Sequence, residues 1–201
     1  MLSTFFAILI GLPLGILLVA GDEKGIHPMP KPLMKVINVI INFLRSVPFL
    51  ILIVMVIPLT RAIIGTSIGS VASIVPLVVA AFPFVARLVE SSLRELDPNI
   101  IEMAQSMGSS TWQIITRVML PESVPSLVTN FTLAITTILG YTAMSGAMGG
   151  GGLGNIAIQI GYSRYKYAVL YIAMIVLVLV VQVFQSVGSR LAVKLDKRIK
   201  R

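Results

Sequence analysis

The sequence has no cysteine and only one histidine, and charged residues occupy just 12% of its 201 positions. Without cysteine the chain cannot form a disulfide bond, an iron–sulfur cluster or a zinc site with thiolate ligands. The single His27 stands next to Pro28, and we interpret it as a solvated loop residue. Soluble domains carry about 25% charged residues, so this low charge content, with 56% hydrophobic residues, indicates a membrane protein with several spans.

Catalytic and nucleotide-binding motifs are missing as well. The sequence has no Ser-His-Asp set, no His-Glu-x-x-His motif and no pair of carboxylates within a span. The run from Gly149 to Gly154 has the spacing Gly-x-Gly-x-x-Gly, but it lacks the preceding strand and downstream acid of a dinucleotide site, and it has no P-loop lysine. We therefore expect no catalytic residue, metal site or cofactor on this chain, and any chemistry of ATP and Mg²⁺ must belong to a partner.

The formal net charge of +8 raises the question of nucleic-acid binding. A nucleic-acid surface would need a basic stripe interleaved with aromatic residues, and the sequence shows none. In membrane proteins, basic residues collect in cytoplasmic loops, where they hold orientation and meet anionic lipid. We therefore expect membrane lipid, and no nucleic acid, as the partner of this charge.

Five apolar stretches predict an all-α, polytopic membrane protein with five transmembrane helices in a single domain, residues 1–201. Each stretch is long enough to cross a bilayer. They cover about residues 2–20, 33–59, 70–93, 124–148 and 167–187. The first stretch has a cleaved signal peptide as its alternative, but no positive charge precedes it and Lys24 follows it, which favours a span. Pro48 is expected to kink the second stretch.

The distribution of lysine and arginine predicts the orientation. With five spans, one side of the membrane receives twelve of these 16 residues, the other side receives three (Arg61, Arg164 and Lys166), and Arg45 lies within a span. The twelve are Lys24, Lys31, Lys35, Arg87, Arg94, Arg117, Arg190, Lys194, Lys197, Arg198, Lys200 and Arg201. The positive-inside rule then places the N-terminus outside, and the C-terminus and residues 97–121 in the cytoplasm.

Residues 97–121, called the jointed loop below, predict two short helices between the third and fourth spans. Asp97 is suited to cap a helix that begins at Pro98, and Gly108 is suited to end that helix with positive φ. Ser110 or Thr111 can cap the second helix, and Pro121 marks either its end or the entry to the next element. Its apolar positions are expected to share one face: Trp112, Ile115, Val118 and Met119.

The jointed loop also carries a recognisable pattern. Glu102-x-Ala104-x-x-x-Gly108, nine residues, and then Val118-x-Leu120-Pro121 resembles the Glu-Ala-Ala loop of ABC importer permeases. Met103 departs from the second alanine of that family and Val118 from its usual isoleucine, while the spacing is kept. Two further stretches resemble the methionine importer permeases in particular. These are residues 45–49 with 57–61 and 65–69, and residues 140–144 with 151–154.

The resemblance implies the type I permease fold and a homodimer that works with two copies of a separate ABC ATPase. It implies that the jointed loop is the coupling helix that docks into the ATPase, through Glu102, Ala104, Gly108, Leu120 and Pro121. It further implies methionine uptake across the inner (plasma) membrane of a prokaryote, from an extracytoplasmic binding protein or lipoprotein. Two alternatives are a permease for another small amino acid and a secondary transporter or channel; a passive membrane anchor would not need the jointed loop.

Several residues are candidates for the translocation path: Arg45, Ser46, Thr129, Thr132, Thr136 and Tyr141. A charge such as Arg45 usually faces a cavity or a polar partner, although it can also snorkel to the interface. The threonines recur at helical spacing, for which close helix packing is the favoured alternative. Gly151, Gly152 and Gly154 are candidates for an outer gate or a docking surface, with a flexible turn as the alternative. Arg87 and Glu90, three residues apart, can form an ion pair.

Overall fold

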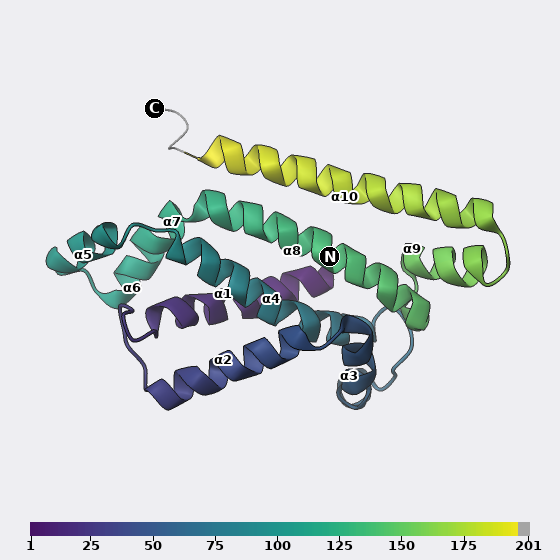
Figure 1. Ribbon diagram of the computed structural model, residues 1–201, viewed down its shortest axis with the longest axis horizontal. Helices are drawn as coiled ribbons and strands as arrows, with labels where there is room; N and C mark the ends of the chain where they lie inside the picture. The colour runs from purple at the N-terminus through teal and green to yellow at the C-terminus, as the bar shows by residue number, and fades with distance from the viewer. Residues whose placement is uncertain (197–201) are drawn as a thin grey trace.

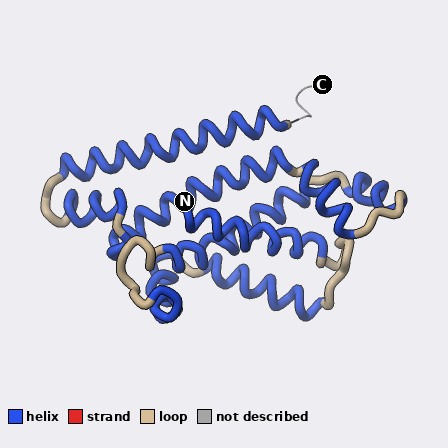
Figure 2. Tube along the Cα trace, turned by 180° about the vertical axis from the view of Figure 1, so that it is seen from behind, coloured by secondary structure: helices blue, strands red, loops and turns tan. Residues whose placement is uncertain are grey.

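The computed structural model describes residues 1–196, and over that range it consists of helices joined by turns (Figures 1 and 2). The predicted all-α class is confirmed. Four helices are long and apolar enough to cross a membrane: α1 (Leu2–Ala20), α4 (Ile74–Arg94), α8 (Val124–Ser145) and α10 (Tyr167–Leu195). Four residues of the charge argument, Lys197, Arg198, Lys200 and Arg201, lie outside the described residues.

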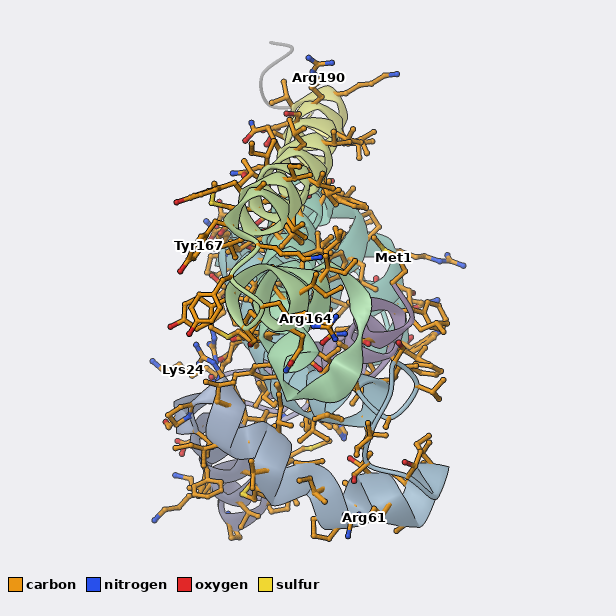
Figure 3. The ribbon with its side chains drawn as sticks, turned by 90° about the vertical axis from the view of Figure 1, so that its right-hand side faces the viewer. Met1, Lys24, Arg61, Arg164, Tyr167 and Arg190 are labelled. Carbon is orange, nitrogen blue, oxygen red and sulfur yellow. The ribbon has the colours of Figure 1, made fainter. Side chains whose placement is uncertain are left out.

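The second predicted span, residues 33–59, is two helices rather than one kinked helix. α2 (Lys31–Ser46) and α3 (Phe49–Ile64) meet at 116°, and the pair counts as a fifth candidate span. Pro48 lacks an N–H and forces the residue before it out of the helical region, so Val47 has ψ 124°. A break therefore replaces the expected kink, and α3 lies across the long axis of the other helices, near the label of Arg61 in Figure 3.

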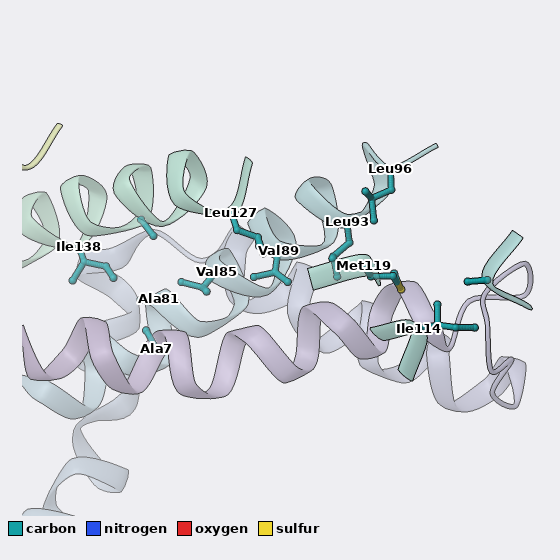
Figure 4. Packing of buried hydrophobic residues seen from close by; sticks show 12 residues of the cluster. Ala7, Ala81, Val85, Val89, Leu93, Leu96, Ile114, Met119, Leu127 and Ile138 are labelled. Carbon is teal, nitrogen blue, oxygen red and sulfur yellow. The ribbon is translucent and has the colours of Figure 1, made fainter. Parts of the chain in front are cut away.

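The core forms where α1 packs against α4. Gly11 and Gly15 face Val85 and Val89 so closely that a Cβ on Gly15 would lie 2.5 Å from the Cβ of Val89. This spacing of small residues lets two membrane helices approach at backbone distance. The buried cluster continues along α4 to the jointed loop and α8, and Figure 4 shows its members: Ala7, Ala81, Val85, Val89, Leu93, Leu96, Ile114, Met119, Leu127 and Ile138.

α10 packs along α8 and leaves most of its own surface exposed. Gly188 of α10 lies close to Thr132 of α8, and a side chain on Gly188 would collide with the threonine. α10 extends beyond the predicted span to Leu195, and α8 ends at Ser145, three residues before the predicted end. The outward surface of α10 is apolar, as a lipid- or subunit-facing helix requires.

Short segments gather at the two ends of the bundle. One end, called the α5 end, holds the loop 21–30, the jointed loop with α5 (Pro98–Ser106), and the C-terminal end of α10. The end of α10 lies there because Asp196, which follows it, lines one cavity together with Glu95 and Glu122. The opposite end, called the glycine end, holds the π-helical segment η2 (Gly146–Gly150), α9 (Gly152–Asn155) and the π-helical segment η3 (Ile156–Tyr162).

Candidate functional site

The first half of the jointed loop folds as its sequence predicts. The carboxylate of Asp97 accepts a hydrogen bond from the backbone N–H of Asn99 at 3.0 Å and so caps α5. Gly108 has φ +76°, and its N–H donates to the carbonyl oxygen of Gln105 at 2.9 Å. A residue with a Cβ adopts this φ only with strain, so glycine is the residue that lets the chain turn sharply after α5.

The second half begins as expected and then changes its helical period. Ser110 and Gln113 form a reciprocal capping box that starts α6 (Thr111–Gln113). The chain then widens into the π-helical segment η1 (Ile114–Met119) before α7 (Leu120–Glu122). Pro121 has no N–H to donate and its ring collides with the carbonyl four residues back, which explains a widened turn at this place.

The widened turn corrects one prediction about this helix. Ile114 and Met119, five residues apart, are the buried positions of η1, at 1% and 0% exposure. Trp112, which was expected on one face with Ile115, Val118 and Met119, is exposed and lies with Ile115 along a groove beside α1. The prediction assumed a period of 3.6 residues, and the π-helical turn shifts the residues after Gln113 around the axis.

The jointed loop divides its side chains between the core and the surface. Ala104 is buried at 7% exposure in the same cluster as Leu93 of α4 and Met119. A larger side chain at residue 104 would push α5 away from that cluster. Glu102 and the apolar Met103 and Met107 are exposed, the two methionines by 60% and 79%. The loop thus presents an acid and two adaptable apolar side chains on a knob whose other face is part of the core.

A network of charged and amide groups ties α2 and the loop 21–30 to α4. Arg87 donates to the carboxylate of Glu90 at 2.6 Å, to Asn38 Oδ1 at 2.6 Å and to Asn42 Oδ1 at 2.9 Å. The Arg87–Glu90 pair was predicted, whereas the sequence did not assign the two asparagines to Arg87. Their spacing of four residues on α2, opposite a charged α4, is the signal that could have found them.

The network continues to the membrane surface through Arg94. This guanidinium donates to the second oxygen of Glu90 at 3.0 Å and to Asp22 Oδ2 at 2.8 Å. The hydrogen bond from Arg94 lowers the pKa of Asp22 below its ordinary value of 3.8. The loop 21–30 is therefore fastened to the last turn of α4, immediately before the jointed loop.

The threonines predicted on α8 do not act as one stripe. Thr132 is buried against Gly188 of α10, which supports its role in close helix packing. Thr129 instead lines a polar cavity of about 400 Å³ at the α5 end, next to Asn130. The hydroxyl of Thr136 donates to the carbonyl of Leu133 on its own helix. Of the three threonines, Thr129 is thus the one that lines this polar cavity.

The break between α2 and α3 brings together two of the path candidates. Arg45 and Tyr141 border a cavity of about 140 Å³, whose other lining residues are Leu44, Val47, Phe49, Leu52, Ala80 and Phe84. The rings of Phe49 and Tyr141 stack with centroids 4.5 Å apart and planes 12° apart. Ser46 stays outside this cavity, and its hydroxyl donates to the carbonyl of Asn42 at 2.8 Å. This space is called the Arg45 cavity below.

The glycine run packs against the loop that follows α3. The N–H of Gly69 donates to the carbonyl of Gly149 at 3.2 Å, and a Cβ on Gly151 would lie 2.8 Å from Ser70 Oγ. Gly151 and Gly152 both have φ +75°, and Gly154 is buried against the backbone of Ala143. The run is thus a folded turn with a close backbone approach, which the interpretation as a flexible turn does not describe.

The comparison with protein families identifies one match. Residues 4–201 match the family described as binding-protein-dependent transport system inner membrane component. A probable D-methionine transport system permease protein of Pasteurella multocida (strain Pm70) is 47% identical over 197 residues, which cover 98% of this chain and 90% of that protein. The methionine import system permease protein of Bacillus subtilis (strain 168) is 40% identical over 176 residues, covering 88% and 79%.

Solved structures give the same picture of the fold. A chain of the MetNI methionine ABC transporter, in an inward-facing conformation, matches with a TM-score of 0.94 and 44% identity, covering 97% of this chain and 90% of that one. A chain of an amino acid ABC transporter with histidines matches with a TM-score of 0.68 at 21% identity, which supports the fold alone. The predicted type I permease fold is therefore confirmed.

Proposed function

Because the chain belongs to the family of binding-protein-dependent transport system inner membrane components, we propose that it is the permease subunit of an ATP-driven importer of methionine. The observation that carries this proposal is the joint match of sequence and fold to methionine permeases over nearly the whole chain. The chain is a transport subunit, and ATP hydrolysis belongs to a separate ATPase chain. In the proposed assembly, two permeases join two ATPases, each with its own ATP and Mg²⁺, and a binding protein or lipoprotein outside the membrane delivers the substrate.

The jointed loop is proposed as the contact with the ATPase. Its exposed face offers Glu102, Met103 and Met107, an acid beside two flexible apolar side chains that suit a groove in a partner. Gly108 allows the sharp joint, while Leu120 and Pro121 end the loop at the start of α8. The remaining residue of the pattern, Ala104, ties the knob to Leu93 and so to α4.

This attachment suggests how force passes into the membrane. When ATP closes the ATPase pair, the two knobs move toward each other, and each carries α4 and α8 as a rigid unit through its buried face. The movement switches the central cavity from inward-facing to outward-facing, and hydrolysis resets it. Thr129, Ser46 and the Arg45 cavity border the proposed route, and the folded glycine run with Gly151, Gly152 and Gly154 is proposed as its outer closure or as the docking surface of the binding protein.

The orientation follows from the charge argument together with the arrangement of the ends. The loop 21–30, the jointed loop and the end of α10 share the α5 end, which carries the excess of basic residues. We place this end in the cytoplasm of a prokaryotic cell, with the N-terminus toward the outside. The glycine end, near Arg61 and Arg164, then faces the binding protein.

A secondary transporter needs an ion-coupling acid within a span, and the structure argues against one here. Glu90 is the only acid that lies within a candidate span, and its two oxygens bind Arg87 and Arg94. Both oxygens of this carboxylate are thus already engaged by arginines of the same chain, which leaves neither open to a coupling ion. A permease for a different small amino acid remains the second candidate, because the apolar path suits several side chains.

The test is transport by the reconstituted parts. Permease, ATPase and binding protein in liposomes should import labelled methionine only when ATP is enclosed on the side of the ATPase. Glu102→Lys should abolish uptake and reduce co-purification of the ATPase, because it reverses the charge on the knob. Glu23→Lys, the same charge reversal on the exposed loop 21–30, is the matched control. Uptake without ATP, or normal coupling in Glu102→Lys, would contradict the proposal.

A further inference from the structure

Arg45 of α2 differs from Arg87 of α4 because, among the described residues, it has no hydrogen-bond or ion-pair partner, and its side chain is exposed on the surface of the single chain. Arg87 binds one carboxylate and two amide oxygens, so its charge is neutralised by its own chain. In the described part of the chain, residues 1–196, no hydrogen bond or ion pair to the guanidinium of Arg45 is present. The five N–H donors of the planar Arg45 guanidinium are therefore available to an acceptor from outside the chain.

The missing counter-charge cannot come from elsewhere in the permease. The sequence has eight acidic residues, and all of them lie toward the α5 end: Asp22, Glu23, Glu90, Glu95, Asp97, Glu102, Glu122 and Asp196. A second copy of the chain adds the same eight acids at the same end of the membrane. An anion that reaches Arg45 must consequently be a ligand.

The depth of Arg45 argues that it faces a polar route. It lies about 21 Å along α2 from Lys31, at 1.5 Å per residue, and its cavity reaches Phe84, the middle residue of α4. The snorkelling alternative requires Arg45 to be near the α5 end, and its distance from Lys31 argues against that. An unpaired guanidinium at this depth is costly in lipid, so it belongs to a water-filled route or to a bound ligand.

The surroundings of Arg45 suit the head of an amino acid. α3 begins beside it at Phe49, and this helix N-terminus has no side-chain cap, so its positive end adds to the positive charge. The stacked rings of Phe49 and Tyr141 form an apolar wall of the same cavity. A volume of about 140 Å³ is small for a whole ligand, so the cavity fits a carboxylate with its neighbouring carbon while the side chain lies in the wider route.

We propose that Arg45 binds the α-carboxylate of the transported amino acid during its passage, and that the break between α2 and α3 exists to hold this site. The inference rests on the proposed function, which it deepens by naming the group that the permease recognises. The permease is then selective for the zwitterionic head of its substrate, and the apolar wall tolerates the side chain. The break at Pro48 places a helix N-terminus and an arginine at one point, which a continuous span could not do.

The test compares two ligands that differ only at the carboxylate. Binding of methionine and of methionine amide is titrated on the transporter in lipid nanodiscs without the binding protein. Arg45→Gln should weaken methionine binding about tenfold and leave the amide unchanged, because a charge-assisted pair is lost only for the carboxylate. Arg45→Lys should keep part of the preference as a point charge. Lys35→Gln, an exposed cation on the same helix, is the control that should alter neither ligand.

The outcomes separate this inference from the proposed function. Equal loss of both ligands in Arg45→Gln would mean a structural role and overturn the inference, as would an unchanged methionine affinity or no methionine binding by the wild type. ATP-driven methionine uptake would stand in each of those cases. If the wild type instead imports another amino acid and Arg45→Gln loses only the carboxylate form of that solute, the assignment of Arg45 stands and the methionine assignment fails.

Discussion

The guanidinium of Arg87 lies 2.6 Å from the carboxylate of Glu90, one turn along α4, and the two side chains are only 20% and 12% exposed. A half-buried pair of this kind is sensitive to the loss of one partner, because the remaining charge then lacks compensation. Arg87→Gln should destabilise the permease by about 3 kcal/mol, the low end for breaking a buried pair. The double variant Arg87→Gln/Glu90→Gln should recover part of that loss. Thermal unfolding of the purified transporter measures both.

The control for this pair is Lys31→Gln. Lys31 contacts Glu23 at 3.2 Å with both side chains well exposed, and such surface pairs contribute little. It should leave the melting temperature almost unchanged. If Arg87→Gln were equally mild, or if the double variant were worse than the sum of the single ones, the network would not hold α2 to α4 in the way described.

The contact between α1 and α4 gives a second prediction. A Cβ on Gly15 would lie 2.5 Å from the Cβ of Val89 and 2.6 Å from the backbone oxygen of Ala86, so the helices must separate to admit it. Gly15→Val should cost about 1–3 kcal/mol, the usual penalty for overpacking, and lower the amount of folded permease in the membrane. The control is Leu9→Val on the exposed face of α1. Normal yield and melting of Gly15→Val would contradict the close packing.

Some parts of the fold followed from local chemistry alone. The caps at Asp97 and Ser110, the positive φ at Gly108 and the pair Arg87–Glu90 each depend on residues within a few positions, and periodicity with capping rules found all of them. The bounds of α1 also match the prediction, because an apolar run with abrupt polar ends leaves little choice.

Other parts depended on contacts between distant segments. Proline indicates a break but not its angle, so the 116° turn at Pro48 could not be predicted. A helical period of 3.6 residues also did not predict the π-helical segment η1, in which Ile114 and Met119, five residues apart, are both buried. The ion pair of Asp22 with Arg94 joins residues 72 positions apart. That Arg45 has no partner within residues 1–196 becomes visible only when the structure shows where every acidic residue lies.

The absence of cysteine makes the orientation directly testable. Single cysteines can be introduced at Thr66, in the loop after α3, and at Gln105, on α5, without a background thiol. In intact spheroplasts a membrane-impermeant maleimide should label Thr66→Cys and leave Gln105→Cys unlabelled until the membrane is opened. Both positions are exposed, so access decides the labelling rather than burial. The reverse pattern would overturn the charge argument and exchange the two faces of the permease.

The last prediction concerns the joint itself. Gly108 has φ +76°, and a Cβ there would meet no atom within 4 Å, so a substitution is penalised by backbone strain and not by collision. Asparagine tolerates positive φ better than other residues with a side chain, whereas a β-branched residue tolerates it poorly. Gly108→Val should therefore strain the joint by about 1–2 kcal/mol and reorient the knob, while Gly108→Asn should retain most function.

Three measurements on these two variants decide whether the joint serves coupling. Membrane abundance should be normal in both, because the spans do not contact residue 108. Co-purification of the ATPase and ATP-driven uptake should fall together in Gly108→Val and stay near wild type in Gly108→Asn. Gly108→Asp should also lose ATPase co-purification and uptake, but for a different reason: it adds a negative charge to the surface proposed to contact the ATPase. If Gly108→Val kept both ATPase binding and uptake, the jointed loop would tolerate a changed turn, and a rigid knob that transmits force could no longer be its role.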